Sequence, residues 1–428
     1  MGNEAGLRTR RRSTSPMSGD LDAPRRHRPD YLLVIFMVFL MMLGLVILYS
    51  INPALSQSYE SNFIGKQVLF LLLGLGVFAA ASRFPVRILE RWAPAMLVAG
   101  LLMSLLLLIL SLLPGQPLVT CVGSVCRWFD FGFMSFQPAE FLKFSLVMYL
   151  AVFLSARIRG GDLNDKAASL LPVAIVTGVV SLLIIVLQHD LGTGSVLLAI
   201  TAAMLFVAGM RLKYFMLALG AIVAAGVAFV VSSPHRIERV MTFIGHSGST
   251  DAANYHIEQA LIAIGSGGYF GRGLAQGVQA FGYLPEAAND SIFAVVAEVF
   301  GFVGTLAILL IFGGLVYRLI VITEKSSRPE FRLIMAGITA WIGTHILVNI
   351  GAMIGIIPLT GITLPFLSFG GTSLIFIMAA MGIAFQISHY TTHGTAATSK
   401  QGAGYEDRLR GRRFGGSRDA RRSRHQRA

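Results

Sequence analysis

Long apolar segments recur along the chain and limit what it can fold into. They lie at about 31–51, 67–82, 92–113, 141–156, 169–187, 193–210, 213–232, 291–317, 333–357 and 366–388. Most are close to the roughly 17 to 25 residues that an α-helix needs to cross a bilayer. With 54% hydrophobic and only 13% charged residues, a soluble globule is excluded. We expect an all-α polytopic membrane protein with about ten transmembrane helices, since the alternation typical of membrane β-barrels is missing.

The distribution of basic residues predicts the orientation, because inner loops carry an excess of Lys and Arg. With a cytoplasmic N-terminus, the inner loops hold Arg83, Arg87, Arg91, Arg157, Arg159, Lys166, Arg211, Lys213, Arg318, Lys325, Arg328 and Arg332. The outer loops are longer in total but hold only Lys66, Arg127, Arg236, Arg239 and Arg272. An even number of spans returns the C-terminus to the cytoplasm. We expect a multi-pass protein of the cytoplasmic (inner) membrane with both termini cytoplasmic.

Both ends of the chain are rich in Arg, Gly and Ser. We predict disordered basic cytoplasmic tails at 1–30 and 391–428 around a membrane domain at 31–390. Seven Arg against four acids give +3 over residues 1–30, and Lys400 with nine Arg against three acids gives +7 over 400–428. Contact with anionic lipid headgroups or a cytoplasmic partner is one interpretation. We favour simple retention of solvated tails on the inner side, and we expect no nucleic acid to bind.

The longest predicted exterior loop is 233–290, between the seventh and eighth helices. Its length indicates a function or an internal structure. Within it, Ile257, Leu261 and Ile264 recur at helical spacing, which predicts a short amphipathic helix at the membrane interface. The sequence GSGGYFGRG at 265–273 ends that helix, and its glycines permit close approach of the backbone to another group.

Two cysteines, Cys121 and Cys126, lie in the predicted exterior loop after the third helix. A disulfide is allowed on that side of the membrane, and two free thiols are the alternative. The loop offers no further ligands for a zinc site.

Three acids lie in or next to the apolar run LPEAANDSIFAVVAEVFGF, namely Glu286, Asp290 and Glu298. Asp290 precedes the eighth helix, where an Asp can serve as N-cap, and this is the structural alternative to a chemical role. Glu298 lies about 12 Å deeper at 1.5 Å per residue, a depth at which an acid usually marks a pathway, a pair or a site. Lys143 and Arg127 are candidate partners for Glu298.

Other polar residues cluster on the same outer side of the predicted membrane domain. Gln137, Glu140 and Lys143 open the fourth helix, and Asp190 lies between the fifth and sixth. These residues are candidates for a site at the outer edge of the membrane.

One pair of polar residues lies within a predicted span. His345 and Asn349 are one helical turn apart near the middle of 333–357. They form either a buried hydrogen-bonded pair, which we favour, or part of a polar cavity.

Six motifs in a fixed order carry a family resemblance. They are RWFDFGFMSFQPAEFLKF at 127–144, QHDLGTG at 188–194, HRIERV at 235–240, QALIAIGSGGYFGRGL at 259–274, YLPEAANDSIFAVVAE at 283–298 and GIIPLTGITLPFLSFGG at 355–371. Through them the chain resembles the SEDS proteins (shape, elongation, division and sporulation), the FtsW/RodA family of bacterial membrane proteins. Only the tails lie outside the resemblance. The sequence YLPEA is more similar to the FtsW division branch than to the RodA elongation branch.

The resemblance implies a peptidoglycan glycosyltransferase that polymerises lipid II into glycan strands at the outer face of the cytoplasmic membrane, in septal synthesis during cell division. The family's essential acid falls on Asp290, and its implied role is to deprotonate the acceptor sugar hydroxyl. That hydroxyl then attacks the anomeric carbon of the growing chain and expels undecaprenyl diphosphate. A carboxylate at the start of a helix beside long loops can reach such a hydroxyl in the headgroup layer.

The departing diphosphate needs polar and cationic partners. The candidates for binding the substrate or its diphosphate are Lys143, Arg236, Arg239, Arg272, Glu140 and Asp190. For each Arg, snorkelling to lipid headgroups is an equal alternative. Glu298 and Gln137 are expected to support the cavity, and Glu286 is either a secondary contact or an exposed loop acid.

The resemblance also implies partners. They are lipid II with the growing lipid-linked glycan, a class B penicillin-binding transpeptidase, and other divisome proteins. A divalent cation, Mg²⁺ or Mn²⁺, bridging the diphosphates is compatible with this chemistry, but the sequence shows no dedicated cluster of metal ligands.

The chain departs from the family pattern around the acid. The family usually has His-Thr-Asp-Phe, whereas this chain has Ala288, Asn289, Asp290 and Ser291. Loss of the neighbouring His is expected to alter the pKa or the orientation of Asp290. The other departures are Ala139 for Ser, His189 for Pro and Val299 for a second Glu.

Other functions compete with the polymerase. A flippase for the same lipid-linked precursor would concentrate ionisable groups near the midplane and often show related halves, whereas the acids here gather at the outer edge. Glu298 and His345 keep that alternative open. A non-catalytic scaffold would need Asp290 only as a helix cap, and a RodA-like elongation polymerase is the alternative within the family. No GxxxxGK[ST] motif occurs, so ATP is not expected to drive the reaction.

Overall fold

The computed structural model describes residues 28–52, 63–112, 118–122, 125–132, 134–217, 219–220, 231, 252–279 and 281–391. Most of both predicted tails and most of the predicted span at 213–232 lie outside the described residues. Arg236 and Arg239, two of the predicted diphosphate ligands, also lie outside them.

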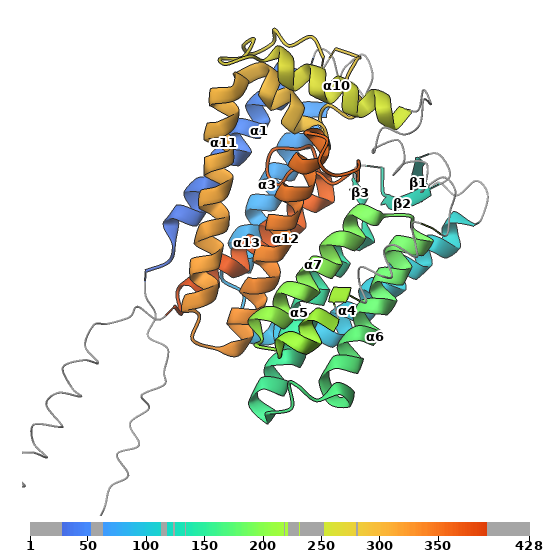
Figure 1. The fold of residues 1–428 in the computed structure, drawn as a ribbon, viewed down its shortest axis with the longest axis vertical. Coiled ribbons are helices and arrows are strands. Elements are labelled where there is room, and N and C mark those ends of the chain that lie inside the picture. Colours follow the sequence, from blue (N-terminus) through green and yellow to red (C-terminus); the bar gives the residue numbers. More distant parts are fainter. Residues whose placement is uncertain are drawn as a thin grey trace, which may run out of the picture. The chain divides into compact units, whose positions relative to one another are not determined.

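Among the described residues, eight helical segments are long and apolar enough to cross a membrane. They are α1 (Tyr31–Ser50), α3 (Phe63–Ala81), α4 (Val86–Ser111), α5 (Pro138–Gly160), the segment Lys166–Val186, α11 (Ile292–Lys325), α12 (Pro329–Met353) and α13 (Gly371–Ser388). A further apolar helix, α7 (Leu191–Val207), is shorter. The chain is a mostly helical, multi-pass membrane protein, as predicted (Figure 1). The total of ten spans stays a prediction, because the run at 213–232 is mostly outside the described part.

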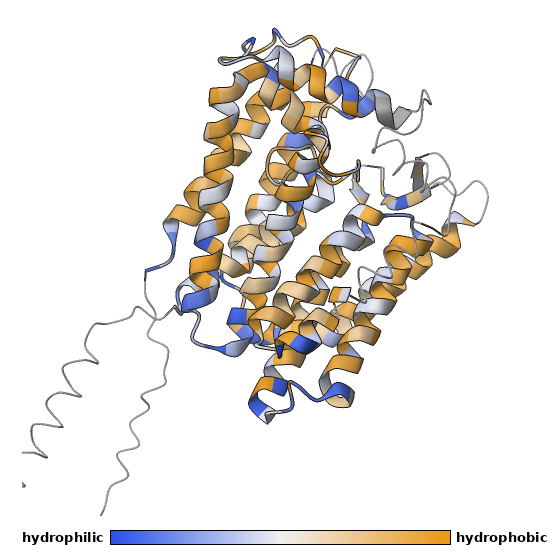
Figure 2. Ribbon diagram, in the orientation of Figure 1, coloured by the Kyte–Doolittle hydropathy of each residue, from blue (hydrophilic) through white to orange (hydrophobic). Residues whose placement is uncertain are grey.

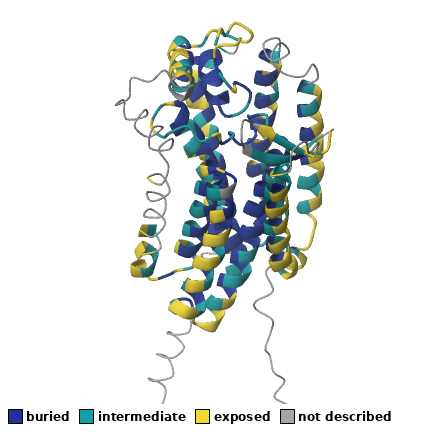
Figure 3. Cartoon of the chain, turned by 90° about the vertical axis from the view of Figure 1, so that its right-hand side faces the viewer, coloured by how far each residue is buried: buried dark blue, intermediate teal, exposed yellow. Residues whose placement is uncertain are grey.

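Each spanning helix divides its apolar surface between protein and lipid. In α1, Leu33, Met37 and Leu40 are buried against neighbouring helices, whereas Phe39 and Met42 are exposed. Both sets are apolar, as expected where lipid rather than water covers the outside. Hydrophobic residues run along the helices and hydrophilic residues gather near their ends (Figure 2). The buried residues line the interior of the bundle (Figure 3).

α12 occupies a central position, because it packs against α5, α7 and α11, while α13 packs against α3. Small residues permit the closest of these contacts. A Cβ added at Gly337 of α12 would lie 2.8 Å from the Val147 side chain of α5. A Cβ added at Gly44 of α1 would lie 2.8 Å from the Leu367 backbone.

α11 is broken at Gly301, where φ is 65° and ψ is −169°. The segment 265–273, called the Gly-rich stretch below, lies over the break and supplies the backbone partners that the helix loses. Four hydrogen bonds join the two segments: Phe302 N to Gly268 O, Val303 N to Tyr269 O, Arg272 N to Glu298 O and Gly273 N to Val299 O. Contact is close, since a Cβ added at Gly271 would lie 2.1 Å from the Val299 carbonyl oxygen. The predicted span 291–317 is thus one apolar run that folds as two helical segments and continues to Lys325.

The helix predicted within the long exterior loop is α10 (Ala252–Ser266). It packs against α11 and α12. α10 lies across the end of the bundle where α11 begins (Figure 1).

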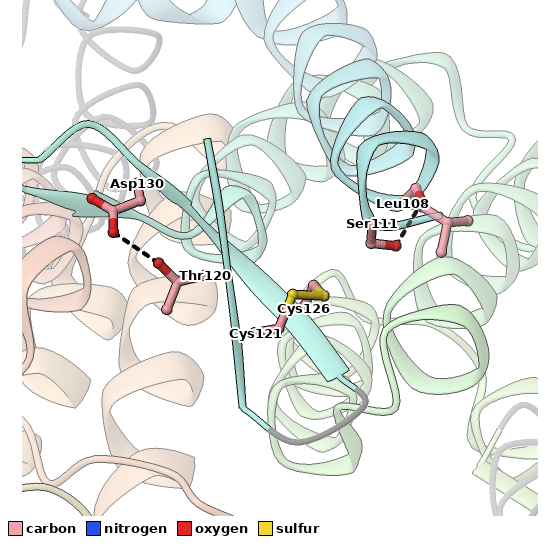
Figure 4. Close-up of a disulfide and its surroundings, with 6 residues drawn as sticks. All are labelled: Leu108, Ser111, Thr120, Cys121, Cys126 and Asp130. Carbon is pink, nitrogen blue, oxygen red and sulfur yellow. Dashed lines mark hydrogen bonds between the residues drawn. A yellow bond between two sulfur atoms is a disulfide. The ribbon is translucent and has the colours of Figure 1, made fainter. Parts of the chain in front are cut away.

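A small antiparallel sheet between α4 and α5 was not expected from the all-helical prediction. Its strands, in the order β1-β2-β3, are β1 (Val119–Val122), β2 (Val125–Asp130) and β3 (Ser135–Phe136). Cys121 pairs with Cys126 across β1 and β2, and the two form a disulfide (Figure 4). Of the two states that the sequence left open for these cysteines, the structure has the bonded one. Thr120 Oγ1 donates to an Asp130 carboxylate oxygen at 3.0 Å and joins the same two strands.

The last predicted span begins later than the apolar run 366–388 indicates. Residues 354–370 form an irregular segment, and α13 starts at Gly371. Phe366 has a φ of 68°, in the left-handed region, where a helix does not continue. The hydroxyl of Ser368 accepts the amide of Leu364 at 2.8 Å and takes the place of a helical partner.

Candidate active site

Asp290 lies in the turn that leads into α11. Only 9% of the residue is exposed, and its Oδ1 has no hydrogen-bond partner among the described residues. Burial, with the negative charge of Glu286 as the second cause, raises the pKa of Asp290 to about 7. A carboxyl group with this pKa can exchange a proton near neutral pH, as a general base must.

Asp290 is not the N-cap of α11. Ser291 occupies the N-cap position, and no side chain caps the helix there. The structural alternative considered for Asp290 is therefore wrong, because the helix begins one residue later than an Asp290 cap requires. A buried carboxyl that caps nothing needs another explanation.

Two elements hold the backbone of the Asp290 turn from one side. The side-chain amide of Asn349, on α12, donates to the carbonyls of Asp290 and Ile362, both at 2.7 Å. Two more bonds come from the irregular segment: Ser368 Oγ to Asn289 O at 2.5 Å and Phe369 N to Ala288 O at 2.8 Å. Because backbone groups accept these bonds, the path of the chain through Asp290 is fixed.

A third element, α10, contacts the turn through His256. Ser291 Oγ donates to the Pro285 carbonyl at 2.8 Å, and His256 Nε2 lies 2.5 Å from the same Oγ. Burial lowers the pKa of His256, while the charge of Glu286 acts in the opposite direction. This contact was not predicted, although His256 belongs to the helix predicted around Ile257.

Lys143 is the largest buried cation of the described core, with 1% of the residue exposed. Its Nζ lies 2.7 Å from Glu140 Oε1 and 3.1 Å from His345 Nε2. Trp341 Nε1 donates to the same His345 Nε2 at 3.2 Å, so this nitrogen is an acceptor. His345 Nδ1 then donates to the Thr363 carbonyl at 3.2 Å.

This network corrects one expectation and bears on a second. No hydrogen bond joins His345 to Asn349 within the described part of the chain, so the predicted pair is wrong; each bonds to the irregular segment instead. Lys143, paired with Glu140 on α5, joins that helix to His345 of α12, an arrangement that favours a structural role for Lys143 and Glu140 over the predicted contact with the diphosphate.

Gln137 and Asp190 lie together at the starts of α5 and α7. Asp190 is the N-cap of α7 and accepts from Thr193 N and Thr193 Oγ1, both at 3.0 Å. Gln137 Nε2 donates to Asp190 at 3.4 Å, and Arg127 lies 4.0 Å from the same carboxylate. For Asp190, predicted to bind the substrate, the geometry favours a role as helix cap.

Glu298 is fully buried, and its carboxylate meets backbone amides rather than a cation. Its Oε1 accepts from Val278 N at 2.7 Å and Gln279 N at 3.2 Å. The predicted partners of Glu298 are wrong, since Lys143 pairs with Glu140 and Arg127 with Asp190. Glu298 thus fastens the segment after α10 to α11.

The remaining predicted residues lie nearer the surface. Glu286 is exposed, has a φ of 49° and accepts from Asn289 Nδ2 at 2.6 Å. Arg272 is exposed, and its Nε donates to the Ser266 carbonyl at 3.3 Å. No group of three or more His, Cys, Asp or Glu among the described residues is arranged to hold a metal ion. Mg²⁺ or Mn²⁺ bound through substrate diphosphates stays a prediction.

An apolar groove of about 580 Å³ lies between α11 and α12. Its lining includes Leu309, Phe312, Leu347 and Ile350, and it contains no ionisable residue. No residue of the Asp290 turn lines it, so the groove does not form part of the candidate active site.

The ordered motifs and this helical arrangement agree with a known family. A family model described as "Cell cycle protein", of the FtsW, RodA and SpoVE type, matches residues 30–393. The chain belongs to the FtsW/RodA/SpoVE family.

Relatives of this FtsW/RodA/SpoVE protein match along most of their length. Stage V sporulation protein E of Bacillus subtilis is 35% identical over 375 residues, which cover 86% of this chain and 99% of that protein. The probable peptidoglycan glycosyltransferase FtsW of Coxiella burnetii is 33% identical over 368 residues, covering 85% of this chain and 96% of that protein.

Solved structures show the same fold for the FtsW/RodA/SpoVE protein. A chain from a peptidoglycan synthase complex that coordinates polymerization and crosslinking aligns with a TM-score of 0.69 at 26% identity, covering 84% of this chain and 97% of that one. The rod shape determining protein RodA of Thermus thermophilus aligns with a TM-score of 0.61 at 26% identity, covering 85% of this chain and 98% of RodA.

Proposed function

We propose that the chain is a peptidoglycan glycosyltransferase that polymerises lipid II in septal cell-wall synthesis. The observation that carries the proposal is Asp290, a buried carboxyl at the start of α11 whose pKa is raised to about 7 and whose Oδ1 lacks a partner among the described residues. Support comes from relatives in the same family that are named probable peptidoglycan glycosyltransferase FtsW.

Asp290 acts as the general base. Its carboxylate removes the proton from the acceptor sugar hydroxyl as the hydroxyl oxygen attacks the anomeric carbon of the growing chain. A new glycosidic bond forms, the bond from that carbon to the diphosphate breaks, and undecaprenyl diphosphate leaves with the electron pair. A positioned base of this kind typically contributes about 10²- to 10⁴-fold to the rate.

The Arg residues of the exterior loop neutralise the negative charge of the leaving diphosphate. Arg272 is exposed at the end of the bundle that carries Asp290, and Arg236 and Arg239 complete the proposed set. Lys143, Glu140 and Asp190 are assigned instead to the support of α5, α7 and α12, since their charges are engaged inside the protein. Glu298, Gln137 and Glu286 support the surrounding loops.

The proposed membrane is the cytoplasmic one, with Asp290 on its outer face and 1–30 and 391–428 as cytoplasmic tails around the membrane domain 31–390. The distribution of basic residues between loops supports this orientation. The proposed partner is a class B penicillin-binding transpeptidase, together with other divisome proteins. Its support is that a chain of similar fold was solved within a peptidoglycan synthase complex.

Two alternatives carry less weight. A flippase would use ionisable groups within the membrane domain, but Lys143 and His345 are bonded to one another and to neighbouring groups. A RodA-like elongation polymerase would share the chemistry, and relatives named FtsW favour the division role.

The test is polymerisation of purified lipid II into a glycan ladder, with the partner transpeptidase present. We expect a ladder from the native chain and none from folded Asp290→Asn. The matched control is Asp162→Asn, an exposed residue after the other end of α5, which should polymerise normally. A ladder from Asp290→Asn equal to the native one would refute Asp290 as the base. No ladder from the native chain, despite a competent partner, would refute the polymerase.

A further inference from the structure

We propose that His256 is a positioning residue. Its hydrogen bond to Ser291, called the latch below, attaches α10 to the turn that carries Asp290. The latch itself follows from geometry, and only its effect on catalysis rests on the proposed function. His256 and Ser291 are 35 residues apart in sequence, and their side chains meet at 2.5 Å.

The direction of the contact follows from counting hydrogens. A serine hydroxyl has one hydrogen, and Ser291 Oγ donates it to the Pro285 carbonyl at 2.8 Å. The bond between Ser291 Oγ and His256 Nε2 therefore takes its hydrogen from the imidazole, so His256 is the donor. Ser291 Oγ is held from two sides, by α10 and by the start of its own turn.

Ser291 is the residue next to Asp290, so what holds Ser291 also holds Asp290. The Ser291 amide donates to the Glu286 carbonyl at 3.2 Å, and its hydroxyl reaches Pro285, so residue 291 closes the turn on itself. From another side, Asn349 binds the Asp290 carbonyl at 2.7 Å. The peptide of Asp290 is thereby held between α10 and α12, as expected when a reactive group is fixed by the residues around it.

The latch does not depend on the charge of His256. A neutral imidazole with its hydrogen on Nε2 donates this bond, and so does the protonated ring. The groups that face the turn are Glu286 on the turn itself, His256 on α10 and the neutral Asn349 on α12. Any change in the pH dependence of activity should therefore report Asp290 and its surroundings rather than loss of a proton from His256.

The latch also accounts for one departure of this chain from the family pattern. The usual residue at the Ser291 position is Phe, which has no hydroxyl to accept a bond. Ser291 and His256 together give this chain a polar attachment between α10 and the Asp290 turn.

Two pairs of variants test the latch in the full chain with its partner. His256→Ala removes the donor, whereas His256→Gln restores a donor near the Nε2 position. Ser291→Ala removes the acceptor, whereas Ser291→Thr keeps a hydroxyl. The matched control is Glu258→Gln, an exposed residue on α10 that takes no part in the site.

We expect His256→Ala to lower kcat by about tenfold with KM changed by less than about twofold, because misplacement of a catalytic group acts on the chemical step. His256→Gln should recover most of this loss. The acid limb of the pH–rate profile should move to lower pH in His256→Ala, because a loosened α10 admits water to Asp290 and weakens the effect of burial. His256→Ala and Ser291→Ala combined should cost no more than Ser291→Ala alone, since Ser291→Ala already breaks the bond to His256, together with the bond to Pro285.

Hydrogen–deuterium exchange measures the attachment of α10 to the Asp290 turn independently of catalysis. Amides of 252–266 and 285–291 should exchange faster in His256→Ala and Ser291→Ala, but not in Glu258→Gln. The inference is overturned if His256→Ala matches the native chain in exchange and kcat, if folded His256→Gln is as impaired as His256→Ala, or if the two losses add. Should His256→Ala not fold, Ser291→Ala decides by the exchange of amides 252–266 on α10, because loss of its second bond, to Pro285, acts within 285–291. Faster exchange with no glycan ladder from the native chain would refute the proposed function and leave the latch standing.

Discussion

The side-chain amide of Asn349 donates a 2.7 Å hydrogen bond to the backbone carbonyl of Asp290 and so joins the last turns of α12 to the candidate base. The same amide binds the Ile362 carbonyl at 2.7 Å, and Asn349 itself is buried. One side chain therefore fixes two irregular segments that meet at the start of α11.

Replacement of Asn349 by Ala should impair both stability and polymerisation. It leaves two buried carbonyls without donors, at a cost of about 1–3 kcal/mol for each such group. We expect a lower melting temperature in detergent and glycan synthesis reduced by at least about tenfold, because Asp290 is no longer held in place. Thr339→Ala, which removes a hydroxyl elsewhere on α12, is the control. Native activity in Asn349→Ala would show that the bond is not needed for positioning.

The rate of polymerisation should rise with pH through about 7, the pKa to which burial and Glu286 raise Asp290, because the base acts when ionised. Glu286→Gln removes a negative charge that disfavours ionisation, so it should lower the pKa of Asp290 and move the acid limb to lower pH. Much of the elevation should remain, since burial is the larger cause. The measurement is initial rate against pH, with Glu258→Gln as the neutral comparison. An acid limb that stays in place would remove Glu286 as a cause.

Asp290→Asn should stabilise the fold at pH 8. A folded-state pKa of about 7 against the ordinary aspartate value of 3.8 means that the folded protein favours the protonated acid. Stability contributed by this group is complete below 3.8 and is lost as the pH rises to about 7. Each pKa unit corresponds to about 1.4 kcal/mol, so the gain from a neutral Asn is at most about 4 kcal/mol. Melting temperatures of both proteins at pH 4.5 and pH 8 check this; an equal difference at both values would contradict it.

Lys143→Met should be far more harmful than the double replacement Lys143→Met with Glu140→Gln. The single change leaves the Glu140 carboxylate buried without its 2.7 Å partner, and loss of one member of a buried pair costs about 3–5 kcal/mol. The double change removes both charges and should recover most of that loss. Thermal unfolding of the two single variants and the double variant gives the coupling energy; purely additive effects would mean that the pair is not coupled.

Gly271→Ala should destabilise the protein more than Gly282→Ala. Both positions have positive φ, 80° and 99°, so both share the backbone cost of a left-handed alanine, about 1–2 kcal/mol. Only the Cβ at position 271 would also meet a neighbour, the Val299 carbonyl oxygen at 2.1 Å, whereas none lies within 4 Å at 282. Melting temperatures compared side by side test the difference, and equal losses would show that the contact with α11 yields easily.

The apolar runs and the motifs were sufficient to predict the helical membrane fold and the family, because those signals are local in sequence. The role of Asp290 as base stays a prediction. The partners of the buried charges were not predictable in the same way. Glu298 is bound by the backbone amides of Val278 and Gln279. Such partners cannot be predicted from residue types, because every residue except proline has a backbone amide. The contact of His256 with Ser291 needs the path of the chain between them, which no periodicity specifies.

Backbone groups alone make the four bonds between the Gly-rich stretch and the break in α11. Variation among related chains should therefore be uneven along this stretch. Gly271 has no room for a side chain, whereas Tyr269 and Phe270 are 76% and 85% exposed and contribute only their main chain to the contact. The two aromatic positions are free to diverge without cost to the fold, so this is a place where one lineage can acquire a different outer surface while keeping the same helix.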